Sequence, residues 1–318
     1  MPAVFDLRRM EVPVVQAGMG AVAGHELAAA VSEAGALGTI AGARARIADE
    51  VAAARRLTGR PVAVNLLLPF VRPGDVEAAA AADVIVTFWG VPRRLTATTW
   101  LHQCGSVEEA KAAAAAGADG VIAQGVEAGG HVRGTTPALE LLEQVRRAVD
   151  IPVLVAGGIV DAQGVREALD AGAAAAVVGT RFLLSEECRA HPAYKRRCLQ
   201  ASETVLTELF GLGWPDAPHR VIPNAATRRW LGDDARGPRW IRAGNRMMSR
   251  LVNAMPAAAQ DRAVRALAPS WLPYAIAQPP TDDGPAELVD GRPLYAGANV
   301  GRIDDIRGAA DLVRALTP

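Results

Sequence analysis

The chain has 318 residues, half of them hydrophobic, and its 34 basic side chains equal its 34 acidic ones. A formal net charge of zero, without a basic stripe, argues against a nucleic-acid partner. Residues 1–10 lack the apolar run of a signal peptide. The sequence also contains no uncharged apolar run of about 18 residues, the length needed to span a membrane. Cys104, Cys188 and Cys198 lack the spacing of a metal site or a redox pair, which is typical of a reducing, cytoplasmic environment, so we expect a cytoplasmic protein.

Short β-branched runs alternate with alanine-rich helical patterns over the first 182 residues. The predicted strands are 12–18, 37–42, 61–68, 83–90, 100–105, 120–124, 152–158 and 174–182. The predicted helices between them are 25–35, 47–59, 74–82, 106–117, 138–149 and 161–172, with only 93–97 available between the fourth and fifth strands. Strands joined by helical crossovers lie parallel, and eight such units predict an α/β fold of the (β/α)8 TIM-barrel type.

The main alternative is a doubly wound open sheet. In that fold, the run from Gly18 to Gly24 would superficially resemble a dinucleotide-binding fingerprint. Its third glycine comes one residue late, and residues 39–46 offer no acidic residue at the end of the second strand. These two departures favour the barrel.

The regular alternation stops after Phe182, and residues 211–285 are rich in Pro, Trp and Arg. The helical patterns that remain are 186–202, 245–255, 257–267 and 304–316. We therefore expect a barrel made of residues 1–210 and 292–318, with a small, mostly helical second domain (a substrate or lid domain) over residues 211–291. The chain would leave the barrel and return to close it with its last helix.

In such barrels the active site forms at the carboxyl ends of the strands. The lysines, Lys111 and Lys195, fall on predicted helices, which argues against Schiff-base and pyridoxal-phosphate chemistry. Glu127 is the only carboxylate expected there, so we predict no metal site. The amides that follow neighbouring strands are Asn65, Gln103 and Gln124. Neutral groups that both donate and accept suit a heteroaromatic ring such as isoalloxazine better than a carboxylate or a sugar phosphate.

Glycine turns follow the last two predicted strands, at Gly157-Gly158 and at Gly179-Thr180. These loops most often hold a phosphate in this fold, through backbone N–H groups and a helix N-terminus. Arg181 could neutralise part of the phosphate charge. Ordinary turn chemistry would explain either glycine pair alone, but their occurrence at both strands predicts a phosphate site.

A second glycine-rich stretch follows the sixth strand and runs from Gln124 to His131. Gly129 and Gly130 allow the backbone to approach a ligand closely, because no Cβ intervenes. His131, one of five histidines, comes directly after them and is a candidate for proton transfer. The alternative is a loop histidine that caps the next helix.

Taken together, these motifs resemble the nitronate monooxygenases, FMN-dependent barrels related to the flavin enoyl-acyl-carrier-protein reductases. The resemblance rests on residues 16–20, 64–65, 123–131, 156–159 and 179–182, and is extended by 191–195 and 295–297. It implies that His131 is the catalytic base. The residues that it implies around FMN are Asn65, Gln124, Gly129, Gly157, Gly158, Gly179, Thr180, Arg181 and Phe182. We add the candidates at the same strand ends, Gly18, Met19, Gln103 and Gly130.

Two features depart from the family pattern. Val132 precedes Arg133 and Gly134 where the family usually has a tighter sequence, and this could shift the loop after His131. The connection 90–100 is too short for a full helix, which could expose apolar surface for a partner subunit, as in a homodimer, or widen the substrate entrance near Phe88 and Trp89.

The resemblance implies FMN-dependent oxidation of alkyl nitronates and nitroalkanes by dioxygen to carbonyl compounds and nitrite, with His131 removing the α-proton of a neutral nitroalkane. One alternative is an NAD(P)H-dependent flavin reductase that acts on quinones or enoyl thioesters. Another is a flavin-free, phosphate-binding lyase or isomerase that uses Glu127 and His131. A barrel that binds FMN or a partner without turnover is a third.

Overall fold

The computed structural model describes residues 10–41, 47–255, 259 and 277–318. The helix predicted over 257–267 lies, apart from residue 259, outside the described residues. Eight parallel strands form one sheet in the order β1-β9-β8-β6-β5-β4-β3-β2. They are β1 (Val14–Gln16), β2 (Gly38–Ala41), β3 (Val62–Leu67), β4 (Val84–Phe88), β5 (Thr99–Cys104), β6 (Gly120–Gln124), β8 (Val153–Ala156) and β9 (Ala176–Val178).

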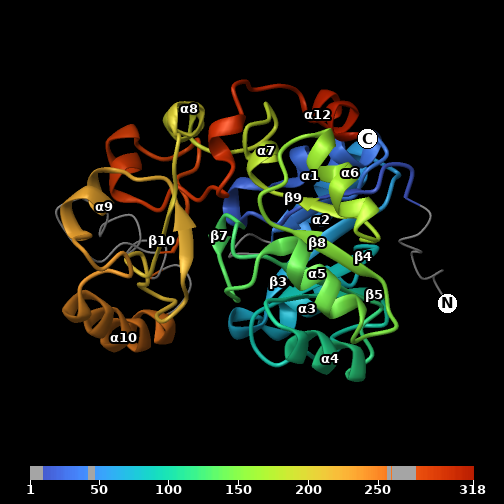
Figure 1. The fold of residues 1–318 in the computed structure, drawn as a ribbon, viewed down its shortest axis with the longest axis horizontal. Coiled ribbons are helices and arrows are strands. Elements are labelled where there is room, and N and C mark those ends of the chain that lie inside the picture. The colour runs from blue at the N-terminus through green and yellow to red at the C-terminus, as the bar shows by residue number, and fades with distance from the viewer. Residues whose placement is uncertain (1–9, 42–46, 256–258, 260–276) are drawn as a thin grey trace.

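The sheet closes because its two outer strands also meet. Val15 forms a parallel bridge with Leu37, whose amide donates to the Val14 carbonyl at 3.0 Å and whose carbonyl accepts from the Gln16 amide at 2.9 Å. The predicted (β/α)8 barrel is therefore confirmed (Figure 1).

Helices cover the outside of the barrel. They are α1 (His25–Glu33), α2 (Ile47–Leu57), α3 (Pro73–Ala79), α4 (Val107–Ala115), α5 (Ala138–Arg146), α6 (Ala162–Asp170) and the last helix, α12 (Ala309–Leu316). Two begin where predicted because an N-cap side chain accepts a backbone N–H: Ser106 from Glu109 before α4, and Asp161 from Gly164 before α6. Among the described residues, no helix has both the length and the apolar character needed to cross a membrane.

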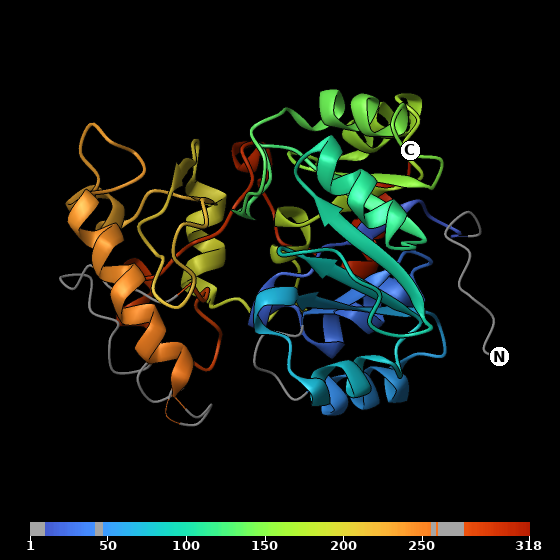
Figure 2. The same ribbon diagram turned by 90° about the horizontal axis from the view of Figure 1, so that it is seen from below.

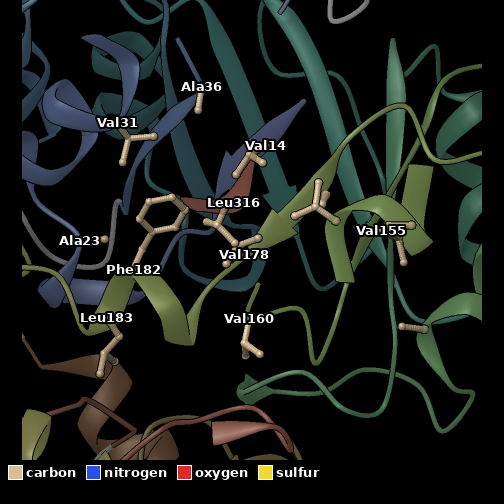
Figure 3. Packing of buried hydrophobic residues seen from close by; sticks show 14 of the residues in the cluster. Val14, Ala23, Val31, Ala36, Val155, Val160, Val178, Phe182, Leu183 and Leu316 are labelled. Atoms are coloured by element: carbon tan, nitrogen blue, oxygen red, sulfur yellow. The ribbon is translucent and has the colours of Figure 1, made fainter. Parts of the chain in front are cut away.

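Apolar side chains fill both faces of the strands. Inside the barrel, Val15 and Leu154 belong to a buried cluster made mostly of strand residues. Outside, Val178 packs with Phe182 and with Leu316 of α12, as Figure 3 shows. Burial of each such side chain contributes about 1.5–3 kcal/mol, so both layers fix the strand ends at which the site lies.

The predicted last strand, 174–182, is wrong in its second half. The strand ends at Val178, and Thr180–Leu183 form the short helix α7, in which the Leu183 amide donates to the Gly179 carbonyl at 3.0 Å. Periodicity does not separate a strand from a buried helix over so short a segment.

The short helix considered over 93–97 is absent, and residues 90–98 connect β4 to β5 without a helix. Trp100 occupies the outer side of the barrel here, fully buried, and its indole Nε1 donates to Thr87 Oγ1 at 2.7 Å. The Arg94 guanidinium lies 5.6 Å from the centre of the Trp100 ring. Together these side chains cover the wall that a helix covers elsewhere.

Residues 211–291 are predicted to form a small, mostly helical domain, and this part of the chain also contributes to a small sheet. Its strands are β10 (Val205–Thr207), β11 (His219–Val221) and β7 (Gly130–His131), and the last of these comes from the barrel loop after β6. Among the described residues of 211–291, the helices are α9 (Ala225–Trp230), α10 (Arg239–Ala254) and the 3-10 turn η4 (Ala286–Gly291). Together with α8 (Pro192–Gln200), these elements lie on one side of the barrel in both views; α10 is the orange helix of Figure 2.

Candidate active site

A cavity of about 770 Å³ lies at the carboxyl ends of the barrel strands. Most of the predicted site residues line it. They are Gly18, Met19, Asn65, Gln103, Gln124, Gly129, Gly130, His131, Gly157, Gly158, Gly179 and Thr180. A volume of this size is in the range of cofactor and substrate pockets.

Two predicted residues do not line the cavity: Arg181 and Phe182. The Arg181 guanidinium pairs with Asp305, at 2.8 Å from both a carboxylate oxygen and the backbone carbonyl. Phe182 is fully buried in the outer core. Both residues belong to α7 rather than to a strand, and neither side chain reaches the cavity. Arg181 pairs with Asp305 and is therefore not placed to neutralise a phosphate there.

The two glycine loops are held by a segment that returns from the end of the chain. Asn299 Nδ2 donates to the Gly158 carbonyl at 2.7 Å, and the Gly297 amide donates to Thr180 Oγ1 at 2.9 Å. Gly158 has φ +71°, and a Cβ there would lie 3.0 Å from Asn299 Nδ2. Residue 158 must therefore be glycine for this turn to form. No local pattern in the sequence indicates the Asn299 contact.

The loop after β6 is fixed by Gln124. Its side-chain amide donates to the His131 carbonyl at 2.9 Å, and its Oε1 accepts from the Arg133 amide at 3.1 Å. At Gly129 an added Cβ would lie 2.6 Å from the backbone of Ala296. The absence of a Cβ at Gly129 therefore lets two segments of backbone, those of Gly129 and Ala296, pack closely together. Gln124 lines the cavity, but it positions His131 rather than presenting a free amide.

His131 lies on β7, in register with His219 of β11. Its Nε2 atom is buried and, among the described residues, has no hydrogen-bond partner. Burial is the main cause that lowers the pKa of His131 well below its usual range, and the neighbouring His219 ring lowers it further. The imidazole is therefore neutral near pH 7, the form that can accept a proton.

Glu127 does not face a reacting group. Its Oε2 accepts from the Ala138 amide at 3.0 Å, at the start of α5. The carboxylate thus satisfies an open N–H group at a helix N-terminus. This contact argues against the lyase or isomerase in which Glu127 and His131 would form an acid–base pair.

Aromatic side chains that are not among the predicted site residues surround His131. Trp214 stacks on its ring, with centroids 3.9 Å apart and planes at 20°. The Tyr295 ring centroid lies 5.6 Å from that of His131, and the Tyr295 hydroxyl is buried with no partner within the described part of the chain. Asn65 and Gln103 line the same cavity. Two buried polar atoms, His131 Nε2 and Tyr295 Oη, are therefore left for a ligand to satisfy.

Away from the cavity, His25, Glu26 and Glu50 lie close enough to share a cation. Arg189 already pairs with both carboxylates, at 2.6 Å from Glu26 and 2.8 Å from Glu50. The positive charge of Arg189 occupies the place of a cation, so this cluster is an ion-pair network.

The chain is similar to proteins of known sequence and structure. The chain is 37% identical over 252 residues to a (3aS,4S,5R,7aS)-5-hydroxy-7a-methyl-1-oxo-octahydro-1H-indene-4-carboxyl-CoA dehydrogenase from Mycobacterium tuberculosis, covering 73% of this chain and 69% of the relative. Its fold is similar to FabK from Thermotoga maritima, with a TM-score of 0.76, 28% identity, and coverage of 98% of this chain and 93% of that one.

A nitroalkane oxidase from Streptomyces ansochromogenes is also similar, with a TM-score of 0.73, 31% identity, and coverage of 96% of this chain and 95% of that one. The sequence profile described as nitronate monooxygenase matches residues 2–103 and 93–318. Because these matches span nearly all of the sequence, the chain belongs to the nitronate monooxygenase family and is an oxidoreductase of that flavin-dependent type.

Proposed function

We propose that this chain binds FMN in the cavity and uses dioxygen to oxidise alkyl nitronates and neutral nitroalkanes to carbonyl compounds and nitrite. The family match and the similarity to a nitroalkane oxidase support the reaction class. The observation that carries the proposal is His131 Nε2, a buried and unpartnered nitrogen on a neutral imidazole that lines the cavity.

The residues present fit FMN. Backbone N–H groups around Gly157, Gly158, Gly179 and Thr180 would hold the phosphate, and the carboxylate of Glu127 is engaged at α5. The side chains that would surround the ring are Asn65, Gln103, Gln124 and His131. Asn65 and Gln103 supply uncharged donors and acceptors, which suit the mixed edge of isoalloxazine.

Bound FMN would supply the electron acceptor for oxidation of the substrate carbanion, with dioxygen as the final oxidant. His131 Nε2 would take the α-proton of a neutral nitroalkane, since its lowered pKa keeps it unprotonated. A nitronate has already lost that proton and needs no base. Burial raises the pKa of Tyr295, so its hydroxyl stays protonated and could donate a hydrogen bond to a nitro oxygen as negative charge develops there.

Replacement of His131 separates the two substrates. In His131→Asn we expect kcat/KM for nitroethane to fall about 10²- to 10⁴-fold, the usual contribution of a general base. Turnover of ethyl nitronate should change less than about threefold, because a loss confined to proton abstraction leaves the later steps intact. Oxygen consumption measures both rates.

The matched control is His191→Asn. His191 does not line the cavity, and its Nδ1 accepts from the Ala193 amide in a cap that asparagine can also form. This variant should retain both activities. Equal losses on nitroethane and on ethyl nitronate in His131→Asn would overturn the assignment of the base.

A second candidate is an NAD(P)H-dependent flavin reductase that acts on a thioester. It is favoured by the similarity to a protein named as a carboxyl-CoA dehydrogenase. Anaerobic mixing distinguishes the two. Bleaching of the flavin spectrum by ethyl nitronate, but not by NADH or NADPH, supports the oxidase, and rapid bleaching by either nicotinamide supports the reductase.

A further inference from the structure

Trp214 occupies a place that the catalytic proposal leaves unexplained. Its indole covers one face of the His131 ring, with centroids 3.9 Å apart. Phe70 and Trp89 contact the indole edge to face, at 5.1 Å and 5.0 Å between centroids. Trp214 is 9% exposed, whereas Phe70 at the outer side is 40% exposed. Trp214 therefore stands between the His131 imidazole and the surface at Phe70.

These aromatic residues come from separate parts of the fold. Phe70 belongs to η3 (Leu68–Phe70), directly after β3, and Trp89 directly follows β4. Trp214 lies between β10 and β11 in the chain, in the segment that precedes α10. The Phe70–Trp214 contact thus joins the barrel rim to this segment, and both rings line the cavity.

Three polar side chains on α10 set the position of Trp214. Asn245, Ser249 and Asn253 are spaced by four residues and so share one face of the helix. Asn245 Nδ2 donates to the Leu209 carbonyl at 3.3 Å, and Ser249 Oγ accepts from the Gly213 amide at 2.8 Å. Asn253 Nδ2 donates to the Gly213 carbonyl at 3.2 Å. Two of these bonds fix the residue directly before Trp214.

We propose that Trp214 is the specificity-determining residue of this site, with its indole shielding His131 and limiting the width of the group that can reach Nε2. The substrates would be nitro compounds with a small substituent at the reacting carbon, and a branched or cyclic substituent would meet the indole. The substrate class rests on the proposed function. The shielding of His131 follows from the contacts and does not depend on it.

The relative activity on a wide and a narrow nitroalkane tests the proposed limit on substrate width. In Trp214→Ala we expect the ratio of kcat/KM for nitrocyclohexane to that for nitroethane to rise about tenfold or more, the usual size of such discrimination in an apolar pocket. Trp240→Ala is the matched control, because Trp240 is 54% exposed on α10 and does not line the cavity. Its ratio should equal that of the wild type. An unchanged ratio in Trp214→Ala overturns the limit on substrate width.

Chemical modification tests the shielding without any turnover. Diethyl pyrocarbonate acylates accessible neutral imidazoles, and mass spectrometry of peptides gives the rate at each histidine of the protein as purified. We expect His131 to react about two- to tenfold faster in Trp214→Ala, the factor expected when one aromatic contact is lost. The buried His102 and His219 should keep their rates and serve as internal references. An unchanged rate at His131 overturns the shielding.

Two further variants keep the test decisive if Trp214→Ala does not fold. Trp214→Phe retains a smaller ring, and Ser249→Ala removes the acceptor of the Gly213 amide while leaving the indole in the chain. Both should raise the selectivity ratio and the His131 acylation rate, by less than Trp214→Ala. A wild type without nitroalkane turnover would count against the proposed function, and the acylation rates would still decide the shielding.

Discussion

Two neighbouring imidazoles with different hydrogen bonding determine the chemistry at His131. The Phe210 amide donates to His219 Nε2 at 3.3 Å, so Nδ1 carries the hydrogen and donates to the Ala217 carbonyl at 2.9 Å. Burial lowers the pKa of His219 to about 4. His219 is thus a neutral, fully bonded ring, whereas the adjacent His131 has a buried nitrogen with no partner among the described residues. Of the two, only His131 is arranged to take a proton.

The pH dependence of nitroalkane turnover follows from the lowered pKa of His131. A base works when it is unprotonated, so a pKa below the ordinary 6.5 extends its active range toward acid. We expect kcat/KM for nitroethane to stay level as the pH falls through 6.5 and to decline only in more acidic buffer. Ethyl nitronate should show no such decline from His131. A decline on nitroethane centred at or above 6.5 would contradict the buried, neutral base.

At the scale of elements, the connection between β4 and β5 shows how the barrel manages without a helix. Trp100 Nε1 donates to Thr87 Oγ1 at 2.7 Å, and the Thr87 hydroxyl lies 2.8 Å from His102 Nδ1. All three side chains are buried. Burial lowers the pKa of His102 to about 4, so the imidazole is neutral and its Nδ1 can accept from Thr87. One hydroxyl therefore satisfies two buried rings.

Removal of that hydroxyl should destabilise the barrel. Thr87→Val keeps the shape of the side chain but leaves the indole N–H and the imidazole Nδ1 without their partner. We expect a loss of about 1–3 kcal/mol in the free energy of unfolding, the cost of unsatisfied buried polar groups. A lower midpoint of urea denaturation would show it. Thr135→Val, at an exposed loop position, should leave the midpoint unchanged, and equal midpoints for both variants would contradict the role of Thr87.

At the scale of the whole molecule, the features that the sequence predicted are those with a local signal. The strands and helices of the barrel follow from apolar periodicity and from glycine stops, such as Gly35 with φ +91° and Gly117 with φ +85°. The glycine loops and His131 could be placed because a barrel brings all strand ends to one edge.

The features that were missed depend on contacts between distant segments. Strands β10 and β11 have three residues each, too short for an alternating pattern, and β11 pairs with the loop of His131. Trp214 carries no motif, and its place over His131 is set by α10. The helix cap made by Glu127 depends on where α5 begins. The division at residues 211–291 remains a prediction, as does a homodimer.

We propose that FMN lies in the barrel mouth with its phosphate at the loops after β8 and β9. The visible spectrum of the purified chain during titration with FMN tests this binding site in the wild type, Gly158→Ala and Gly59→Ala. We predict one bound FMN per chain in the wild type. Binding should weaken in Gly158→Ala, where φ is +71° and Asn299 lies against the added methyl, and stay unchanged in Gly59→Ala, where the methyl meets nothing within 4 Å. A wild-type chain that is colourless and retains no added FMN would contradict the account.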